Sequence, residues 1–127
     1  MKKYLTSLLF LFFSAQLLQA QAPSGTILIY GKVSRNTVPA SDIKILLVEA
    51  TYTEIKFDKT ICNLKKNTPQ VKIFSTDTKG EYNFKGVKKG IRYKLIICDS
   101  RRNKVYITEL RTPASGNNVF RVTEQKI

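Results

Sequence analysis

The sequence predicts an all-β protein, folded as an antiparallel β-sandwich of seven or eight strands. Short segments in which apolar and polar residues alternate run through most of the chain, and this period of two is typical of strands with one buried face. Glycine, proline, asparagine and aspartate separate these segments, as expected for turns. Beyond residues 1–20, no segment has the periodicity of an amphipathic helix.

The first part of the chain differs from the rest. Lys2 and Lys3 precede an apolar run that ends at a small residue, Ala20. A basic start, an apolar centre too short to span a bilayer and a small residue at the exit are typical of a secretory signal peptide. We expect cleavage after Ala20 and a short linker at residues 21–25; an uncleaved membrane anchor is the alternative. The protein is thus predicted to be exported, to the periplasm or outside the cell.

Residues 26–127 are expected to form one domain, which is large enough to bury roughly 65% of its unfolded surface. The whole chain has a formal net charge of +13, and removal of Lys2 and Lys3 with the signal peptide leaves +11. Such a charge attracts anionic partners, for example acidic glycans, lipid headgroups or nucleic acid. The alternative is a solvated, lysine-rich surface, because the charges are scattered rather than gathered in blocks.

The alternation also gives the order of the strands. The first is expected at residues 26–34, and a polar connection follows in which Pro39 stops the pairing, because proline cannot donate a ladder hydrogen bond. The second strand, at residues 43–48, is expected to bury its isoleucine face. The remaining strands are expected at residues 51–57, 71–75, 81–85, 91–98, 104–110 and 119–123.

Two glycine turns flank the strand at residues 81–85. Asp77 suits the first position of a type I turn because its carboxylate can accept a turn amide, and Gly80 can adopt the left-handed conformation that closes a bulged hairpin. Gly90 closes the second turn. We therefore assign structural turn roles to Asp77, Gly80 and Gly90.

Cys62 and Cys98 are the two cysteines of the chain. In an exported protein, an even count favours one disulfide over two free thiols. If Leu95 and Ile97 face the core, Cys98 points out of the sheet, because side chains alternate. The irregular region at about residues 50–70, which carries Cys62, is then expected to cover this outer face as an insertion. No metal is expected, since two cysteines without any histidine cannot complete a structural zinc site.

A further pattern covers most of residues 27–98. It contains a Gly-x-Val strand end, a proline-bearing link, an alternating apolar strand, a Thr-Asp-x-x-Gly turn before an aromatic strand, and a glycine-led strand with tyrosine and leucine. Its residues are Gly31, Val33, Pro39, Ile43, Ile45, Thr76, Asp77, Gly80, Tyr82, Phe84, Gly90, Tyr93 and Leu95. This pattern resembles the carboxypeptidase regulatory-like domains, whose sandwich is transthyretin-like or immunoglobulin-like, and it is similar to collagen-adhesin B-type repeats.

The chain departs from that family pattern in its loops. Arg35, Asn36 and Thr37 replace an Asp-x-x-Gly turn, and Lys88 and Lys89 stand where prolines are common. The resemblance implies an accessory or adhesive module, and some modules of this family precede outer-membrane transporters. Fold alone does not give function.

No constellation of residues in the sequence predicts catalysis. The chain has no histidine, which is the commonest general base. The one catalytic activity that the resemblance implies for this sandwich is hydroxyisourate hydrolysis. The transthyretin-like enzymes with this activity have a site rich in histidine and arginine and a tyrosine-rich C-terminus, and this chain lacks both features. Asp77 and Asp99 are expected in turns at one end of the sandwich, where they form either a carboxylate pair or, as we favour, two caps of backbone amides. We predict a protein that is not an enzyme and binds no cofactor.

Four basic residues are expected at one end of the sandwich, in or beside two turns: Lys79, Arg101, Arg102 and Lys104. Guanidinium groups suit phosphate or carboxylate recognition, so this cluster is either an anion-binding site or a set of solvated turn charges. Lys88, Lys89 and Arg92 belong at the opposite end, which argues against a continuous groove and against dedicated nucleic-acid binding.

The sequence thus predicts an exported, non-catalytic binding or adhesion module whose partner is a protein or an envelope glycan. A periplasmic accessory or structural protein of an outer-membrane transport system is the second hypothesis. An enzyme of unknown reaction is the third.

Overall fold

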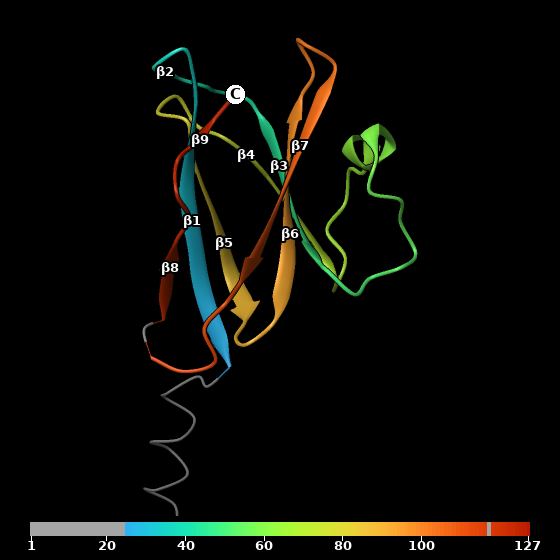
Figure 1. Ribbon diagram of the computed structural model, residues 1–127, viewed down its shortest axis with the longest axis vertical. Coiled ribbons are helices and arrows are strands. Elements are labelled where there is room, and N and C mark those ends of the chain that lie inside the picture. Colours follow the sequence, from blue (N-terminus) through green and yellow to red (C-terminus); the bar gives the residue numbers. More distant parts are fainter. Residues whose placement is uncertain (1–24, 117) are drawn as a thin grey trace, which may run out of the picture.

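The computed structural model describes residues 25–116 and 118–127 (Figure 1). In this part of the chain nine strands form two sheets that pack face to face, and one short 3-10 helix lies beside them. The predicted β-sandwich is confirmed. The predicted signal peptide and residues 21–24 of the linker lie outside the described residues. Among the helices of the described part, none has the length and apolar character needed to span a bilayer.

The first sheet is built around β1 (Thr26–Arg35). This strand pairs antiparallel with β5 (Glu81–Lys88) and with the two-residue β2 (Val38–Pro39). It also pairs in parallel with β8 (Val119–Arg121) and β9 (Gln125–Lys126), which the prediction of a purely antiparallel sandwich did not include. The cause is the route of the chain, because the strand before β8 ends near the start of β1, so the returning segment runs in the same direction as β1 (Figure 1).

The second sheet has the order β4-β3-β6-β7, and its pairings are all antiparallel. Its strands are β3 (Lys44–Glu49), β4 (Val71–Ser75), β6 (Arg92–Asp99) and β7 (Lys104–Arg111). The inner faces of both sheets meet in the main core, which contains Ile27, Ile29, Val33, Ile43, Ile45, Leu47, Tyr82, Phe84, Val87, Tyr93, Leu95 and Ile97. The predicted inward faces of β3 and β6 are therefore confirmed.

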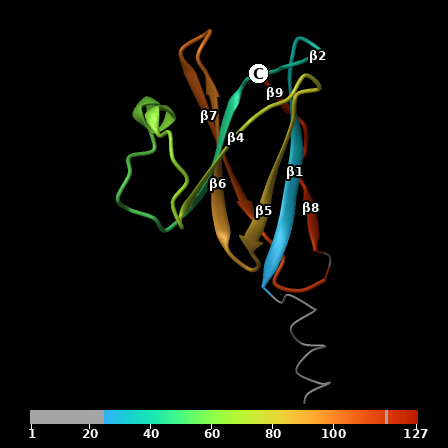
Figure 2. The same ribbon diagram turned by 180° about the vertical axis from the view of Figure 1, so that it is seen from behind.

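Residues 50–70 cover the outer face of the second sheet and stand apart from the first sheet (Figures 1 and 2). The strand expected at residues 51–57 is wrong, since these residues form turns and bends, and η1 (Lys59–Asn63) is a single 3-10 helix. The apolar side chains of this segment face the sheet instead of extending it. They join outward residues of β3, β4 and β6 in a second apolar cluster that includes Leu46, Val48, Tyr52, Ile55, Phe57, Ile61, Val71, Ile96 and Cys98.

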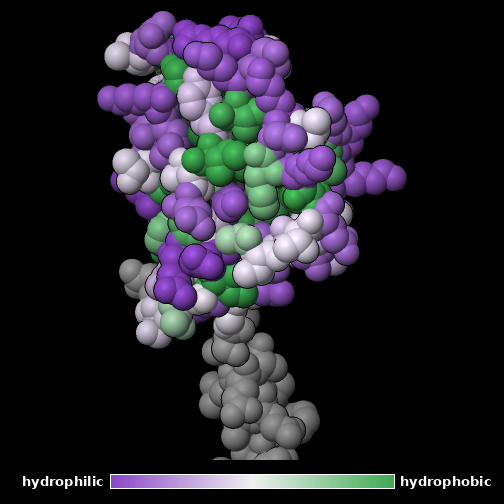
Figure 3. Space-filling model, turned by 45° about the vertical axis from the view of Figure 1, so that its right-hand side comes forward, coloured by the Kyte–Doolittle hydropathy of each residue, from purple (hydrophilic) through white to green (hydrophobic). Residues whose placement is uncertain are grey.

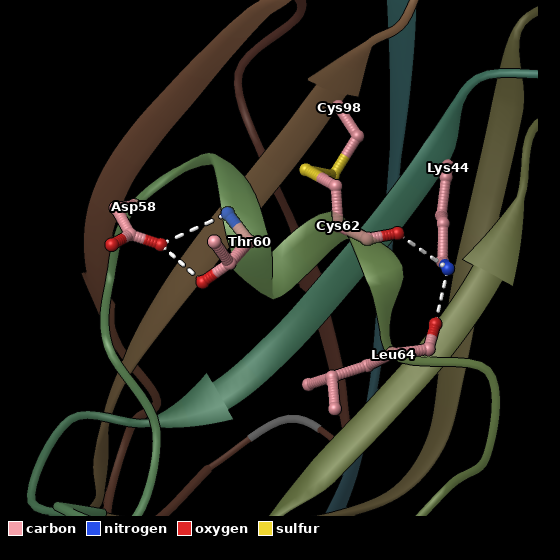
Figure 4. Close-up of a disulfide and its surroundings, with 6 residues drawn as sticks. All are labelled: Lys44, Asp58, Thr60, Cys62, Leu64 and Cys98. Carbon is pink, nitrogen blue, oxygen red and sulfur yellow. Dashed lines mark hydrogen bonds between the residues drawn. A yellow bond between two sulfur atoms is a disulfide. The ribbon is translucent and has the colours of Figure 1, made fainter.

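A disulfide joins Cys62 of η1 to Cys98 of β6, with 5.9 Å between the Cα atoms (Figure 4). This confirms the predicted bridge and the predicted cover. Lys44 Nζ donates a hydrogen bond to the carbonyl oxygen of Cys62 at 2.8 Å and another to that of Leu64. Burial and the nearby charge of Lys65 lower the pKa of the Lys44 ammonium. The insertion is thus fastened to the sheet by a covalent bond and by a lysine.

Two turns match their predicted mechanism. Asp77 Oδ1 accepts hydrogen bonds from the backbone N–H groups of Lys79 at 2.8 Å and Glu81 at 2.9 Å. Gly80 has φ +74°, and a Cβ atom at this position would lie 2.3 Å from the carbonyl oxygen of Val33. Gly90 has φ +70°, as expected for the second turn. Both hairpin ends therefore depend on backbone shapes that glycine adopts without strain.

The connection after β1 is more ordered than predicted. Asn36 and Thr37 have φ values of 49° and 67°, so they form a tight two-residue turn, and Pro39 pairs with Ser34. Proline fits here because β2 is a short edge strand that does not require its missing N–H.

The side of the molecule that carries the insertion exposes patches of hydrophobic surface enclosed by hydrophilic residues (Figure 3). Ile107 of β7 is 42% exposed. The insertion therefore covers the second sheet without sealing its β7 edge.

Candidate functional site

A hollow of about 500 Å³ lies on the outer face of the first sheet. β1 and β5 form its floor, and residues 121–124, from the end of β8 through the link to β9, form one wall. The insertion lies on the far side of the sandwich, so it does not cover this face (Figures 1 and 2). We call this hollow the β1–β5 groove.

The register of three strands places a row of side chains across the groove. Tyr30 of β1 pairs with Asn83 of β5 on one side and with Arg121 of β8 on the other. Neighbouring side chains on one face of a sheet lie about 5 Å apart, so this row is continuous. Tyr30 is 37% exposed, which leaves an aromatic surface available between an amide and a guanidinium group.

The charges of the groove differ from those of the chain as a whole. Asp77, Glu81 and Glu124, three of the nine acidic residues, line it together with Lys32 and Arg121. Its formal charge is therefore −1, from three acids against two bases, in a chain whose net charge is +13. Such a surface offers both donors and acceptors, and it does not favour a polyanion.

The four residues of the predicted basic cluster are exposed, and they do not share one hollow of those that the structure shows. Arg101 lines a hollow of about 140 Å³ beside Arg35 and Pro39. Lys104 lines a different hollow, of about 360 Å³, beside the disulfide. Lys79 and Arg102 line neither of the two.

Asp99 differs from its expected role as a turn cap. It is the last residue of β6 and pairs with Lys104 of β7, so it belongs to the ladder rather than to the turn. Its fully buried carboxylate accepts a hydrogen bond from Arg35 Nη2 at 2.6 Å. This ion pair joins β1 of the first sheet to β6 of the second. Asp77, in contrast, caps its turn as predicted. The two aspartates thus have separate structural partners.

The described residues contain no group of three or more histidine, cysteine, aspartate or glutamate side chains that could hold a metal ion. The full sequence has no histidine. The side chains that line the β1–β5 groove offer hydrogen bonding, aromatic stacking and charge.

Sequence reasoning missed the principal residues of this groove. Tyr30 did carry a signal, because it is an aromatic residue on the outward side of a strand whose inward side is Ile27, Ile29 and Val33. Arg121 carried none, since its position depends on the parallel pairing of a three-residue strand.

Comparisons with known proteins support the fold. No family model matches the sequence, and no curated protein matches it. One similar solved structure is the dioxygenase domain of a dioxygenase carbohydrate-binding protein fusion from the cellulolytic bacterium Streptomyces sp. SirexAA-E. Its TM-score is 0.54 at 12% identity, over 83% of this chain and 80% of that one.

A second structure, a 9R-lipoxygenase from Cyanothece PCC8801, has a TM-score of 0.39 at 10% identity, over 80% of this chain and 16% of that one. At these identities the first likeness shows the fold alone, and the second supports no conclusion. The class that the fold defines is a small, disulfide-bonded β-sandwich.

Proposed function

We propose that this protein is an exported, non-catalytic binding module for a glycan of the cell envelope, and that the β1–β5 groove is its binding site. The observation that carries the proposal is the exposed ring of Tyr30 between Asn83 and Arg121 on a sheet face that the insertion leaves open. A sugar ring has an apolar face that packs on an aromatic ring and hydroxyl groups that need both donors and acceptors.

The mixed charge of the groove fits the same class of ligand. Glu81 and Glu124 accept hydrogen bonds from hydroxyl groups, and Lys32 and Arg121 donate to ring and hydroxyl oxygens. At about 500 Å³, the groove is within the size range of small-ligand sites.

Export and family membership are parts of the same proposal. The disulfide is compatible with an oxidising compartment, where such bonds persist. The turn and core residues Asp77, Gly80, Tyr82 and Gly90 support a place among the carboxypeptidase regulatory-like domains.

The absence of enzyme activity is also proposed. The iron sites of many oxygenases require two histidines and a carboxylate, and this sequence offers no histidine. This chain therefore lacks the histidine ligands of such an iron site, although its fold is similar to that of a dioxygenase domain.

Calorimetric titration of the protein with neutral, amino and uronic oligosaccharides tests the proposal. Tyr30→Ala is expected to lower the affinity for the tightest-binding oligosaccharide by about tenfold or more, since a central tyrosine typically dominates binding. Tyr30→Phe is expected to retain the affinity. Ile107→Ala is the matched control, because Ile107 is similarly exposed on the other sheet. The proposal fails if no oligosaccharide binds, or if Ile107→Ala weakens binding as much as Tyr30→Ala.

A further inference from the structure

The hollow beside the disulfide is built from three separate parts of the chain. β3 and the residues before it contribute Asp42 and Lys44, η1 contributes Lys59 and Asn63, and the β6–β7 hairpin contributes Lys104, among others. Its volume is about 360 Å³. We call it the disulfide hollow; it shares no lining residue with the β1–β5 groove.

Three ammonium groups border this hollow from three different elements. Lys59 and Lys104 are exposed at its rim. Lys44 is held in place, because its Nζ atom donates to the carbonyl oxygens of Cys62 and Leu64 (Figure 4). These two carbonyl groups use two of the three N–H donors of the Lys44 ammonium. Lysines from three elements give the lining a positive charge, which attracts an anion.

The acidic residues of the hollow do not cancel these charges. The carboxylate of Asp99 is already neutralised by Arg35, 2.6 Å away. This leaves three lysines against Asp42, a formal excess of +2. The side chains of Asn63, Ser100 and Asn103 add uncharged hydrogen-bonding groups to the lining.

From this arrangement we infer that the disulfide hollow is a second ligand site, for a monosaccharide unit that carries one anionic group, such as a phosphate, sulfate or carboxylate. The three lysines bind the anionic group. The amides, the serine hydroxyl and Asp42 bind the sugar hydroxyls. A bare oxyanion is too small to use both sets, whereas the hollow is close to the lower limit for small-molecule sites.

The disulfide gives this site its geometry. Lys59 and Asn63 belong to η1, and Cys62 joins η1 to Cys98 of β6. β6 pairs with β7, which begins at Lys104. The two walls of the hollow are thus linked covalently. Reduction of the bond is expected to weaken the site, because it frees η1 from β6.

The basic residues of the disulfide hollow differ from the basic cluster that the sequence predicts. Of its four residues, only Lys104 lines the disulfide hollow. Lys79 and Arg102 are also exposed and lie outside it, so they serve as controls for the general attraction of a basic protein for anions.

The test is a titration of residues 21–127 with glucose 6-phosphate, glucose and inorganic phosphate, in which binding is measured by NMR chemical shifts and by calorimetry. The double substitution Lys59→Gln and Lys104→Gln is expected to lower the affinity for glucose 6-phosphate by about tenfold or more, because two charge-assisted hydrogen bonds are lost. Lys79→Gln with Arg102→Gln removes the same charge and is expected to change the affinity by less than about twofold.

Three outcomes overturn the inference. They are no binding of glucose 6-phosphate, equal weakening by both double variants, and inorganic phosphate binding as tightly as the sugar phosphate. Tyr30→Ala separates this site from the proposed groove, since it is expected to leave glucose 6-phosphate binding unchanged. Loss of glycan binding with retention of sugar-phosphate binding in Tyr30→Ala therefore supports two separate sites.

Discussion

The outer faces of the two sheets have opposite character. On the second sheet, outward residues such as Leu46, Val48 and Ile96 are fully buried, because residues 50–70 lie over them. On the first sheet, outward residues such as Tyr30 and Lys32 line an open groove. One outer face is therefore covered and adds to stability, and the other is open and is the face that we propose for binding.

The difference begins in the sequence of the strands. β3 and β6 are apolar on both faces, and a strand of this kind requires cover on both sides. Burial of an aliphatic side chain contributes roughly 1.5–3 kcal/mol, so the covered face forms a second core. β1 alternates more regularly, and its outward face has no apolar cover in the described structure.

Removal of the disulfide tests how the cover is held. The cysteines are 36 residues apart in sequence, and in the chain-entropy model a loop of this size corresponds to about 3–4 kcal/mol of stability. Cys62→Ala with Cys98→Ala is expected to lower the free energy of unfolding by that amount, measured by urea denaturation. Wild-type protein under reducing conditions is the control and is expected to show a similar loss. A loss below about 1 kcal/mol would show that apolar contacts alone hold the cover.

A pair of alanine substitutions compares the two outer faces directly. Ile96 is fully buried on the covered face, and Ile96→Ala is expected to cost about 2–4 kcal/mol, as in a main core. Asn83 occupies the open face, and Asn83→Ala is expected to change stability by less than about 0.5 kcal/mol. Thermal and urea unfolding measure both. Equal effects would contradict the division into a covered face that adds to stability and an open face that does not.

The covered face was largely predictable from the sequence. Alternation along β6 put Cys98 on the outside, and the need to bury Ile96 there pointed to residues 50–70 as the cover. The conformation of that cover was not predictable. Ile55 and Phe57 have the spacing of one face of a strand, but a loop that lies across a sheet also needs apolar residues on one side, and Tyr52 joins them there.

The open face was harder to predict. Tyr30 is visible as an outward aromatic residue, yet its neighbours Arg121 and Glu124 come from the end of the chain. Arg121 ends β8 and Glu124 precedes β9; these strands have three and two residues, and pairing of such short strands is set by the packing of the whole domain rather than by local sequence. Asp99 shows the same limit, since its partner Arg35 lies 64 residues away.

Two buried tyrosines, one in each sheet, extend the comparison to the inner faces. Tyr93 of the second sheet accepts a hydrogen bond from the backbone N–H of Lys88 at 3.2 Å. Tyr82 of the first sheet packs over Gly31, and its hydroxyl has no hydrogen-bond partner among the described residues. Tyr82→Phe is therefore expected to leave stability at pH 7 unchanged or raised by up to about 1 kcal/mol, whereas Tyr93→Phe is expected to lose about 1 kcal/mol.

The pH dependence of stability distinguishes these tyrosines further. Burial raises the pKa of Tyr82, and burial also raises that of Tyr93. In the unfolded chain both ionise near pH 10, so unfolding releases protons above that pH and the folded state loses stability as the pH rises toward the folded pKa. Urea midpoints measured between pH 8 and pH 11 (about one unit beyond the unfolded pKa) are expected to fall less steeply for Tyr82→Phe than for the wild type. An identical slope in the two proteins would mean that the Tyr82 hydroxyl reaches water, and that the inner face of the open sheet is less closed than that of the covered sheet.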